Sequence, residues 1–138
     1  MQGQVTRHAA VLGAMLLLCA TFTGCQKAKP GASAADIAAA QAEAQKEVAQ
    51  AHAEAKKDVK NATKLAGGDS KQVELARVTG SFDVAMANAD GDHKVAIEQC
   101  MTLPPSGQQS CKNHADADYQ AAAASAKADR VAQLQKTP

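Results

Sequence analysis

The 138-residue chain has room for one domain at most. Its 15 Lys and Arg residues nearly balance its 14 Asp and Glu residues, so nothing in the charge balance suggests the basic stripe that a nucleic-acid partner requires. After residue 25 the only aromatic side chains are Phe82 and Tyr119, and large aliphatic residues are few, which excludes a wide globular core. The composition therefore predicts an all-α fold of long Ala-rich helices with a small or loose core.

Residues 1–24 have the three parts of a secretory signal peptide. A polar start carries Arg7, an apolar run covers residues 9–22, and Thr23-Gly24 forms a small-residue exit. The apolar run is 14 residues long, whereas a helix that spans a membrane needs about 20 residues. We therefore expect export and cleavage rather than an uncleaved membrane span.

The residues at this exit, Phe22-Thr23-Gly24-Cys25, resemble the lipobox of bacterial lipoproteins. The resemblance implies that Cys25 becomes the acylated first residue of the mature chain, with Phe22 standing where leucine is usual. Several acyl chains hold a protein stably in a bilayer, while a single chain does not. The expected location is the cell membrane or the outer membrane, lipid-anchored and facing the periplasm. By the same resemblance, Gln26 favours the outer membrane.

Residues 25–33 read as a polar tether, and residues 34–66 read as one Ala-rich helix without Gly or Pro. Ala, Glu, Gln and Lys, which dominate the second segment, are strong helix formers. The side chain of Ser33 or of Asp36 is placed to cap the start of this helix.

This first helix contains an internal repeat with a period of eleven. The segment 40–50 (AQAEAQKEVAQ) matches the segment 51–61 (AHAEAKKDVKN) at six of eleven positions, and Ile37, Val48 and Val59 recur at the same place in the register. Eleven residues in three turns predict a nearly straight helix with a narrow apolar seam. The pattern resembles the repeats of late-embryogenesis-abundant proteins and of other Ala-rich amphipathic proteins.

Residues 71–135 read as a helical hairpin that follows a stop at Gly67-Gly68. Its first helix runs from Lys71 towards Leu103, with interruptions at Gly80 and at residues 90–92 (Asp-Gly-Asp), and we expect a break or a kink at the second interruption.

The other half of the hairpin follows residues 104–107 (Pro-Pro-Ser-Gly), which are predicted to form a turn. The third helix is expected from about Gln108 to Gln135.

Cys100 and Cys111 bracket that turn. Cys19 leaves with the signal peptide and Cys25 is used for the lipid, so an even pair remains in an oxidising compartment, where disulfides form. A hairpin that is symmetric about the turn pairs residues whose numbers sum to 211, which sets Cys100 against Cys111. We therefore predict a disulfide between these two residues.

The same register brings Ala96 opposite Ala115 and Ala89 opposite Ala122. Small residues opposite one another allow two helices to approach closely. The register also places His93 opposite Asp118, where we expect a hydrogen bond or ion pair on the seam.

An alternative uses the same cysteines as ligands of a zinc or copper ion. The four residues would be His93, Cys100, Cys111 and His114, which are ligand types that these metals accept. The spacing from Cys111 to His114 suits one helix, but His93 lies about two turns from Cys100. Free or exchanging thiols are a third alternative. We predict the disulfide, and no cofactor.

A second resemblance covers residues 82–128. Phe82-Asp83-Val84-Ala85, Val95-Ala96 with Cys100, and Cys111 with Ala115 and Ala117 are similar to elements of a group of uncharacterised exported proteins of beta-proteobacteria. This resemblance implies a cystine-linked helical hairpin and assigns no activity.

The sequence contains no Ser-His-Asp arrangement, Gly-rich phosphate loop or HExxH motif. We therefore expect that the protein is not an enzyme. The leading hypothesis is a non-enzymatic envelope lipoprotein, with the bilayer and an envelope protein as partners. In this hypothesis the first helix is a spacer and the hairpin is an interaction module. Two alternatives remain: a stress protectant that binds membranes or unfolded proteins through the repeat, and a periplasmic metal-binding protein.

Overall fold

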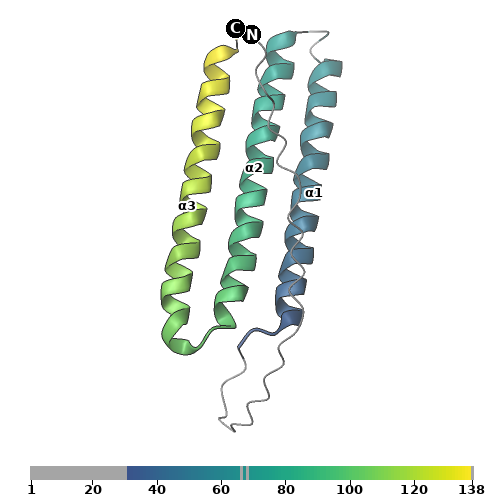
Figure 1. Ribbon diagram of the computed structural model, residues 1–138. Coiled ribbons are helices and arrows are strands. Elements are labelled where there is room, and N and C mark those ends of the chain that lie inside the picture. Colours follow the sequence, from purple (N-terminus) through teal and green to yellow (C-terminus); the bar gives the residue numbers. More distant parts are fainter. Residues whose placement is uncertain (1–30, 66, 68, 138) are drawn as a thin grey trace, which may run out of the picture.

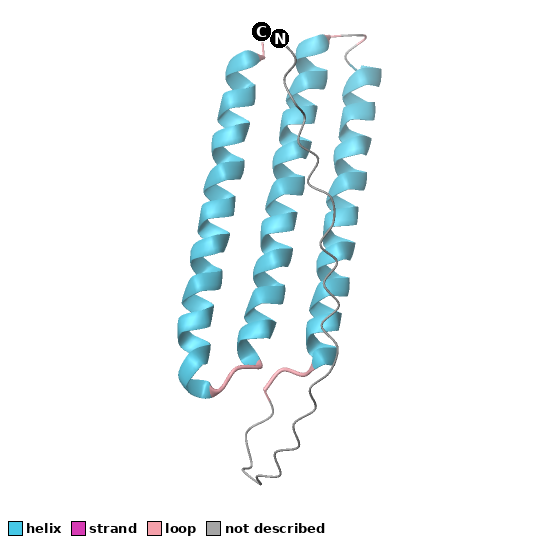
Figure 2. Cartoon of the chain, in the orientation of Figure 1, coloured by secondary structure: helices cyan, strands magenta, loops and turns pink. Residues whose placement is uncertain are grey.

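The computed structural model describes residues 31–65, 67 and 69–137, which form three helices of equal length. They are α1 (Ala34–Leu65), α2 (Ser70–Met101) and α3 (Pro105–Lys136), each of 32 residues. The predicted all-α class is confirmed: Figure 2 shows helices joined by short loops and no strand in the part of the chain that is described. The predicted signal peptide, the lipobox-like exit and Cys25 lie outside the described residues.

The three helices lie side by side in one layer, with α2 in the middle (Figure 1). Contacts join α1 to α2 and α2 to α3, and among the described residues none joins α1 to α3. The first helix therefore packs along α2 and does not project as a separate spacer. Within the described part of the chain, no helix covers either broad face of α2.

A reciprocal cap begins α1. The Ser33 hydroxyl accepts from the backbone N–H of Asp36 at 3.3 Å, and the Asp36 carboxylate accepts from the backbone N–H of Ser33 at 2.7 Å. The two candidate caps of the sequence are thus partners in one capping box. The Ser33 hydroxyl also donates to the Asp36 carboxylate at 2.8 Å. The backbone N–H of Ser33, and after it this hydroxyl, hold the pKa of Asp36 below its usual value.

Helix α2 is continuous, so the predicted interruptions at Gly80 and at residues 90–92 are wrong. Its start is capped by Asp69, which accepts from the backbone N–H of Lys71 at 3.0 Å. Gly80 and Gly91 are buried. The cost of a glycine inside a helix, about 1 kcal/mol relative to alanine, is outweighed by the packing that the two glycines allow.

The predicted turn at residues 104–107 is also corrected, because α3 already begins at Pro105. Proline suits the first position of a helix, where no partner for its missing N–H is needed. The link between α2 and α3 is therefore shorter than predicted, and the side chain of Gln108 closes it. Its Nε2 donates to the carbonyls of Leu103 at 2.9 Å and Met101 at 3.3 Å.

The buried core is thin and lies between α2 and α3. Its members share small size, and they are Val78, Ala89, Cys100, Ala115, Ala123 and Ala126. The three from α2 recur at every eleventh position, and Ala115 and Ala126 in α3 have the same spacing. The period found in α1 therefore continues through all three helices. A period of eleven keeps each seam on one side of a straight helix, which is what a flat layer needs.

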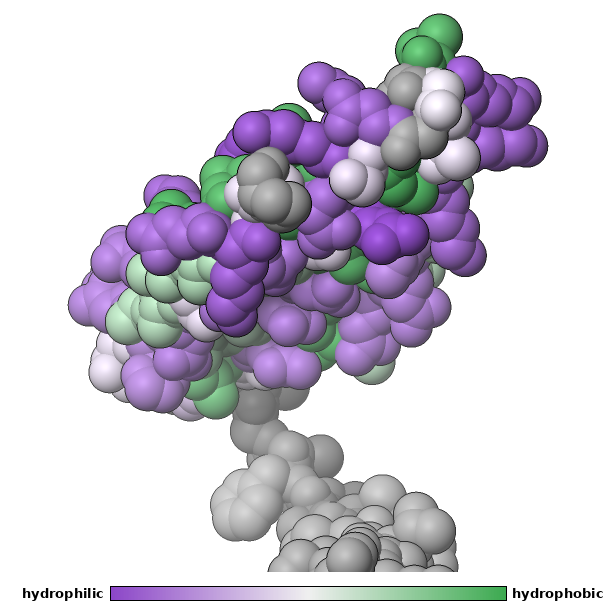
Figure 3. All heavy atoms as spheres, turned by 90° about the horizontal axis from the view of Figure 1, so that it is seen from above, coloured by the Kyte–Doolittle hydropathy of each residue, from purple (hydrophilic) through white to green (hydrophobic). Residues whose placement is uncertain are grey.

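Seen along the helices from above Figure 1, the surface is mostly hydrophilic, with apolar residues scattered among polar ones (Figure 3). None of the three described helices is long and apolar enough to cross a bilayer.

Candidate functional site

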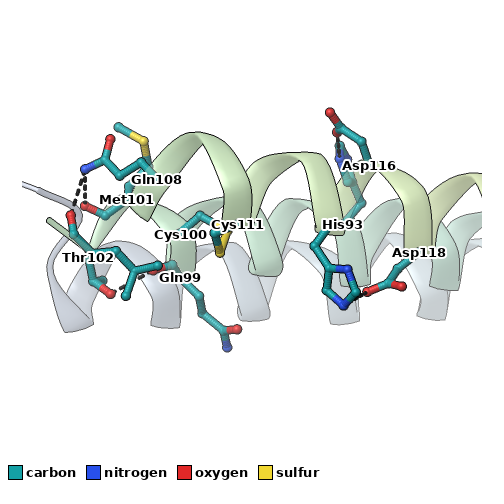
Figure 4. Close-up of a disulfide and its surroundings, with 11 residues drawn as sticks. His93, Gln99, Cys100, Met101, Thr102, Gln108, Cys111, Asp116 and Asp118 are labelled. Carbon is teal, nitrogen blue, oxygen red and sulfur yellow. Dashed lines mark hydrogen bonds and ion pairs between the residues drawn. A yellow bond between two sulfur atoms is a disulfide. The ribbon is translucent and has the colours of Figure 1, made fainter. Parts of the chain in front are cut away.

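The predicted cysteine pair is joined at the loop end of the α2–α3 seam. Cys100 and Cys111 form a disulfide with their Cα atoms 5.5 Å apart, and Figure 4 shows this bond beside the Gln108 contacts to the loop. Cys100 is 1% exposed. The residues around the next groove of the seam, which include Ala96 and Ala115, and Ala89 and Ala122, agree with the register that the sequence predicts.

The partner predicted for His93 is wrong. Its Nε2 lies 2.7 Å from Oδ1 of Asp116, whereas Asp118 faces His114 of its own helix at 3.8 Å. The register fixes the level along a helix but not the side, and residues two apart point to nearly opposite sides. His93 turns towards the broad face of the layer that carries Asp116.

Two aromatic contacts lie along the same seam. The ring of His93 lies 5.1 Å from that of Tyr119, tilted by 36°. A hydrogen bond to the Asp90 carboxylate, then its charge, raises the pKa of Tyr119 above its usual value. Further along the seam, Phe82 lies under the Arg130 guanidinium at 4.9 Å. Phe82 is eleven positions from His93, and Arg130 is eleven positions from Tyr119. The period of eleven therefore applies to the aromatic contacts of this seam as well as to its small residues.

The four residues of the metal-site alternative are not brought together. The two cysteines are bonded to each other, His93 is paired with Asp116, and the side chain of His114 is 82% exposed. Within residues 31–65, 67 and 69–137, no group of three or more His, Cys, Asp or Glu side chains is arranged to hold a metal ion. The described residues therefore lend the metal-site alternative no support.

The seam between α1 and α2 is built on glycine. A Cβ added to Gly80 would lie 2.6 Å from the Cβ of Ala55, and one added to Gly91 would lie 2.8 Å from the Cβ of Ala44. The two glycines are eleven positions apart, and so are the two alanines. The sequence-based prediction did not give the glycines this role, although their spacing, equal to the repeat of the first helix, is a signal that could have found it.

One broad face of this seam carries ion pairs. Nζ of Lys94 lies 2.7 Å from Oε1 of Glu47 and 3.6 Å from Oε1 of Glu43. The hydrogen bond to Glu47 is the main reason that the pKa of Lys94 is raised. The two glutamates lie two positions from Gln45 and Gln41, which line hollows on the opposite side of the seam. The ion pairs therefore occupy one broad face and leave the other face open.

The open face has a groove between α1 and α2 with a volume of about 540 Å³. Its floor is formed by part-buried or buried small residues, and its rim by four exposed polar side chains, His52, Lys56, Arg77 and Ser81. A second hollow of about 350 Å³ shares His52 and extends the groove to Gly91 and Asp92. This groove is the candidate binding surface considered below.

No family model matches the chain, and neither a curated protein nor a solved structure matches it.

Proposed function

We propose that the chain is a non-enzymatic cell-envelope lipoprotein that presents a rigid layer of three helices for interaction with another molecule. The observation that carries the proposal is the lipobox-like segment Phe22-Thr23-Gly24-Cys25 after an apolar run. The disulfide is consistent with an oxidising compartment such as the periplasm.

The geometry of the tether supports an orientation on the membrane. A Cβ on Gly31 would lie 2.5 Å from the carbonyl oxygen of Met101, so the chain enters the layer at the disulfide end. Cys25 is six residues before Gly31, a span of at most about 20 Å. An acylated Cys25 therefore holds the disulfide end near the bilayer, and helices of 32 residues carry the other end about 50 Å away.

In this arrangement the whole layer, rather than the first helix alone, is the spacer. The cystine hairpin and α1 present one surface together, because α1 packs along α2. The hollows between α1 and α2 supply the interaction surface, at a distance from the bilayer that the helices set.

Mass spectrometry of the protein from a native membrane fraction tests this proposal. The expected N-terminus is an acylated Cys25, with Cys100 linked to Cys111 before reduction. The Cys25→Ser variant serves as the control, and it is expected to carry no lipid and to keep its disulfide. A mature N-terminus without lipid would contradict the proposal.

A further inference from the structure

We propose that the groove between α1 and α2 binds a single-chain anionic amphiphile, with the anionic head at the Lys56 and Arg77 end and the acyl chain along the floor. This site goes beyond the proposed function, since it does not depend on the anchor at Cys25. It names the class of molecule that the layer recognises.

The floors of the two hollows that make up the groove are apolar. At the larger hollow it consists of Ala55, Val59, Gly80 and Val84, and Val48 and Gly91 extend it beneath the second hollow. At Gly80 and Gly91 the two helices come close together, because Ala55 and Ala44 occupy the space that a Cβ would need. The two hollows have volumes of about 540 Å³ and 350 Å³, and both are widely open to solvent.

At the larger hollow the rim of the groove is positively charged. Lys56 and Arg77 stand at the larger hollow beside His52, and no carboxylate of the described residues lines that hollow. The pair between Arg77 and Glu74 is long, at 3.6 Å, and Arg77 is 63% exposed in it, so guanidinium N–H groups stay available. The acidic side chain of the groove, Asp92, is at the opposite end. This separation of charge selects an anionic head and fixes its direction.

The length of the groove sets the length of the acyl chain that it can hold. Arg77 and Asp92 are fifteen residues apart on α2, which is about 22 Å at 1.5 Å per residue. That length holds one long acyl chain that lies extended along the groove. A chain lying in an open groove keeps one side in water, so each added methylene is expected to raise the affinity roughly twofold.

Calorimetric titration of the purified full chain carrying Cys25→Ser tests the proposal. Tetradecanoate and tetradecyl phosphate, both below their micellar concentrations, are expected to bind one to one, and decanoate more weakly. Dodecyl maltoside, which has an uncharged head, is expected to bind much less well, and inorganic phosphate not measurably. An affinity for dodecyl maltoside equal to that for the two anionic amphiphiles would overturn the role of the rim.

The charge-reversal variant Lys56→Glu/Arg77→Glu is expected to lose about tenfold or more in affinity for tetradecanoate. Lys57→Glu/Lys127→Glu, which changes the same charge at exposed positions outside the groove, is the matched control and should bind as the parent does. Circular dichroism confirms that both variants are helical.

Three results would overturn the inference. One is an unchanged affinity in Lys56→Glu/Arg77→Glu. Another is binding to anionic vesicles without binding to monomeric tetradecanoate, which assigns the rim to a membrane surface. The third is a dimer in sedimentation equilibrium that Lys56→Glu/Arg77→Glu dissociates, which assigns the groove to a second copy. Failure of lipidation at Cys25 affects none of these measurements, so the two proposals fail separately.

Discussion

The two seams of the layer have the same period and opposite chemistry. Between α1 and α2 the helices meet through Gly80 and Gly91 against alanines, and α1 has no buried residue of its own. Between α2 and α3 the seam contains the buried core, a disulfide and two aromatic contacts. The first seam depends on close backbone approach, and the second on a covalent bond and on larger side chains.

The difference shows how a chain with few large apolar residues holds three helices together. A thin core stabilises little, so each seam needs a further device. In the α2–α3 seam the disulfide stabilises the fold by reducing the conformational freedom of the unfolded chain. In the α1–α2 seam the glycines let the two helices come closer, which increases the packing contacts per residue. The two seams should therefore respond differently to substitution.

The largest effect is expected from removal of the disulfide. Cys100→Ala/Cys111→Ala should lower the free energy of unfolding by about 3 kcal/mol, the chain-entropy value for a loop of about a dozen residues. Urea unfolding of the oxidised parent and of the variant measures it. A variant as stable as the parent would contradict the account, because the α2–α3 seam would then not need its covalent bond.

Gly80→Ala breaks the other seam. Alanine in place of an exposed helical glycine stabilises by about 1 kcal/mol, but here the new Cβ meets Ala55, and overpacking of this kind costs about 1–3 kcal/mol. The stability of the variant should fall, and Ala55→Gly in the same chain should restore it.

The matched control is Gly107→Ala in the first turn of α3. Its new Cβ would meet only Leu103 at 3.9 Å, an ordinary contact distance, so this variant should be neutral or more stable. Equal behaviour of Gly80→Ala and Gly107→Ala in thermal unfolding would refute the close approach of α1 and α2.

A smaller effect is expected from Lys94→Met. The variant loses the pairs with Glu47 and Glu43, which are partly exposed and screened by salt. Its midpoint of thermal unfolding should fall by less than that of Gly80→Ala, and the difference from the parent should shrink at high salt. The parent should keep this contribution at neutral pH and lose it as the pH rises through the raised pKa of Lys94. A salt-independent loss would argue against the ion pairs.

The smallest effect is a pH dependence at the start of α1. The pKa of Asp36 is lowered in the folded state, so the capping box contributes at pH values above the usual carboxyl pKa of about 3.9. The contribution is lost as the pH falls through the lowered pKa. Amide chemical shifts of residues 33–37 should report fraying below about pH 4, and Asp36→Asn should remove this dependence. The same acid transition in Asp36→Asn would assign it to another group.

The sequence predicts the parts of this fold that follow from composition and local signals. The long Ala-rich helices, the cap at Ser33 and Asp36, and the pairing of Cys100 with Cys111 depend on residues close in sequence or on a symmetric register. The repeat of the first helix is visible for the same reason, because identical side chains recur in it.

The predictions that are wrong concern residues whose role is set by a neighbouring helix. In the sequence, Gly80 and Gly91 indicate helix breaks, because their packing against Ala55 and Ala44 is visible only in the structure. Pro105 is predicted to lie in a turn, although proline also suits the first position of a helix. The partner of His93 depends on which broad face its ring turns to, and a one-dimensional register does not contain that information. The groove results from the arrangement of the helices in one layer. The sequence predicts that arrangement only when the three helices are aligned by their common period of eleven.

The distance between α1 and α3 tests the layer most directly. Spin labels on cysteines introduced at His52 of α1 and Asp129 of α3, with the native disulfide left oxidised, allow a pulsed electron–electron measurement. Packed helix axes lie about 8–10 Å apart, so α1 and α3 should be separated by about 16–20 Å with α2 between them. A narrow distribution consistent with that separation is the result expected. A distribution centred near that of directly packed helices would mean a three-helix bundle, and it would remove the groove and the open face together.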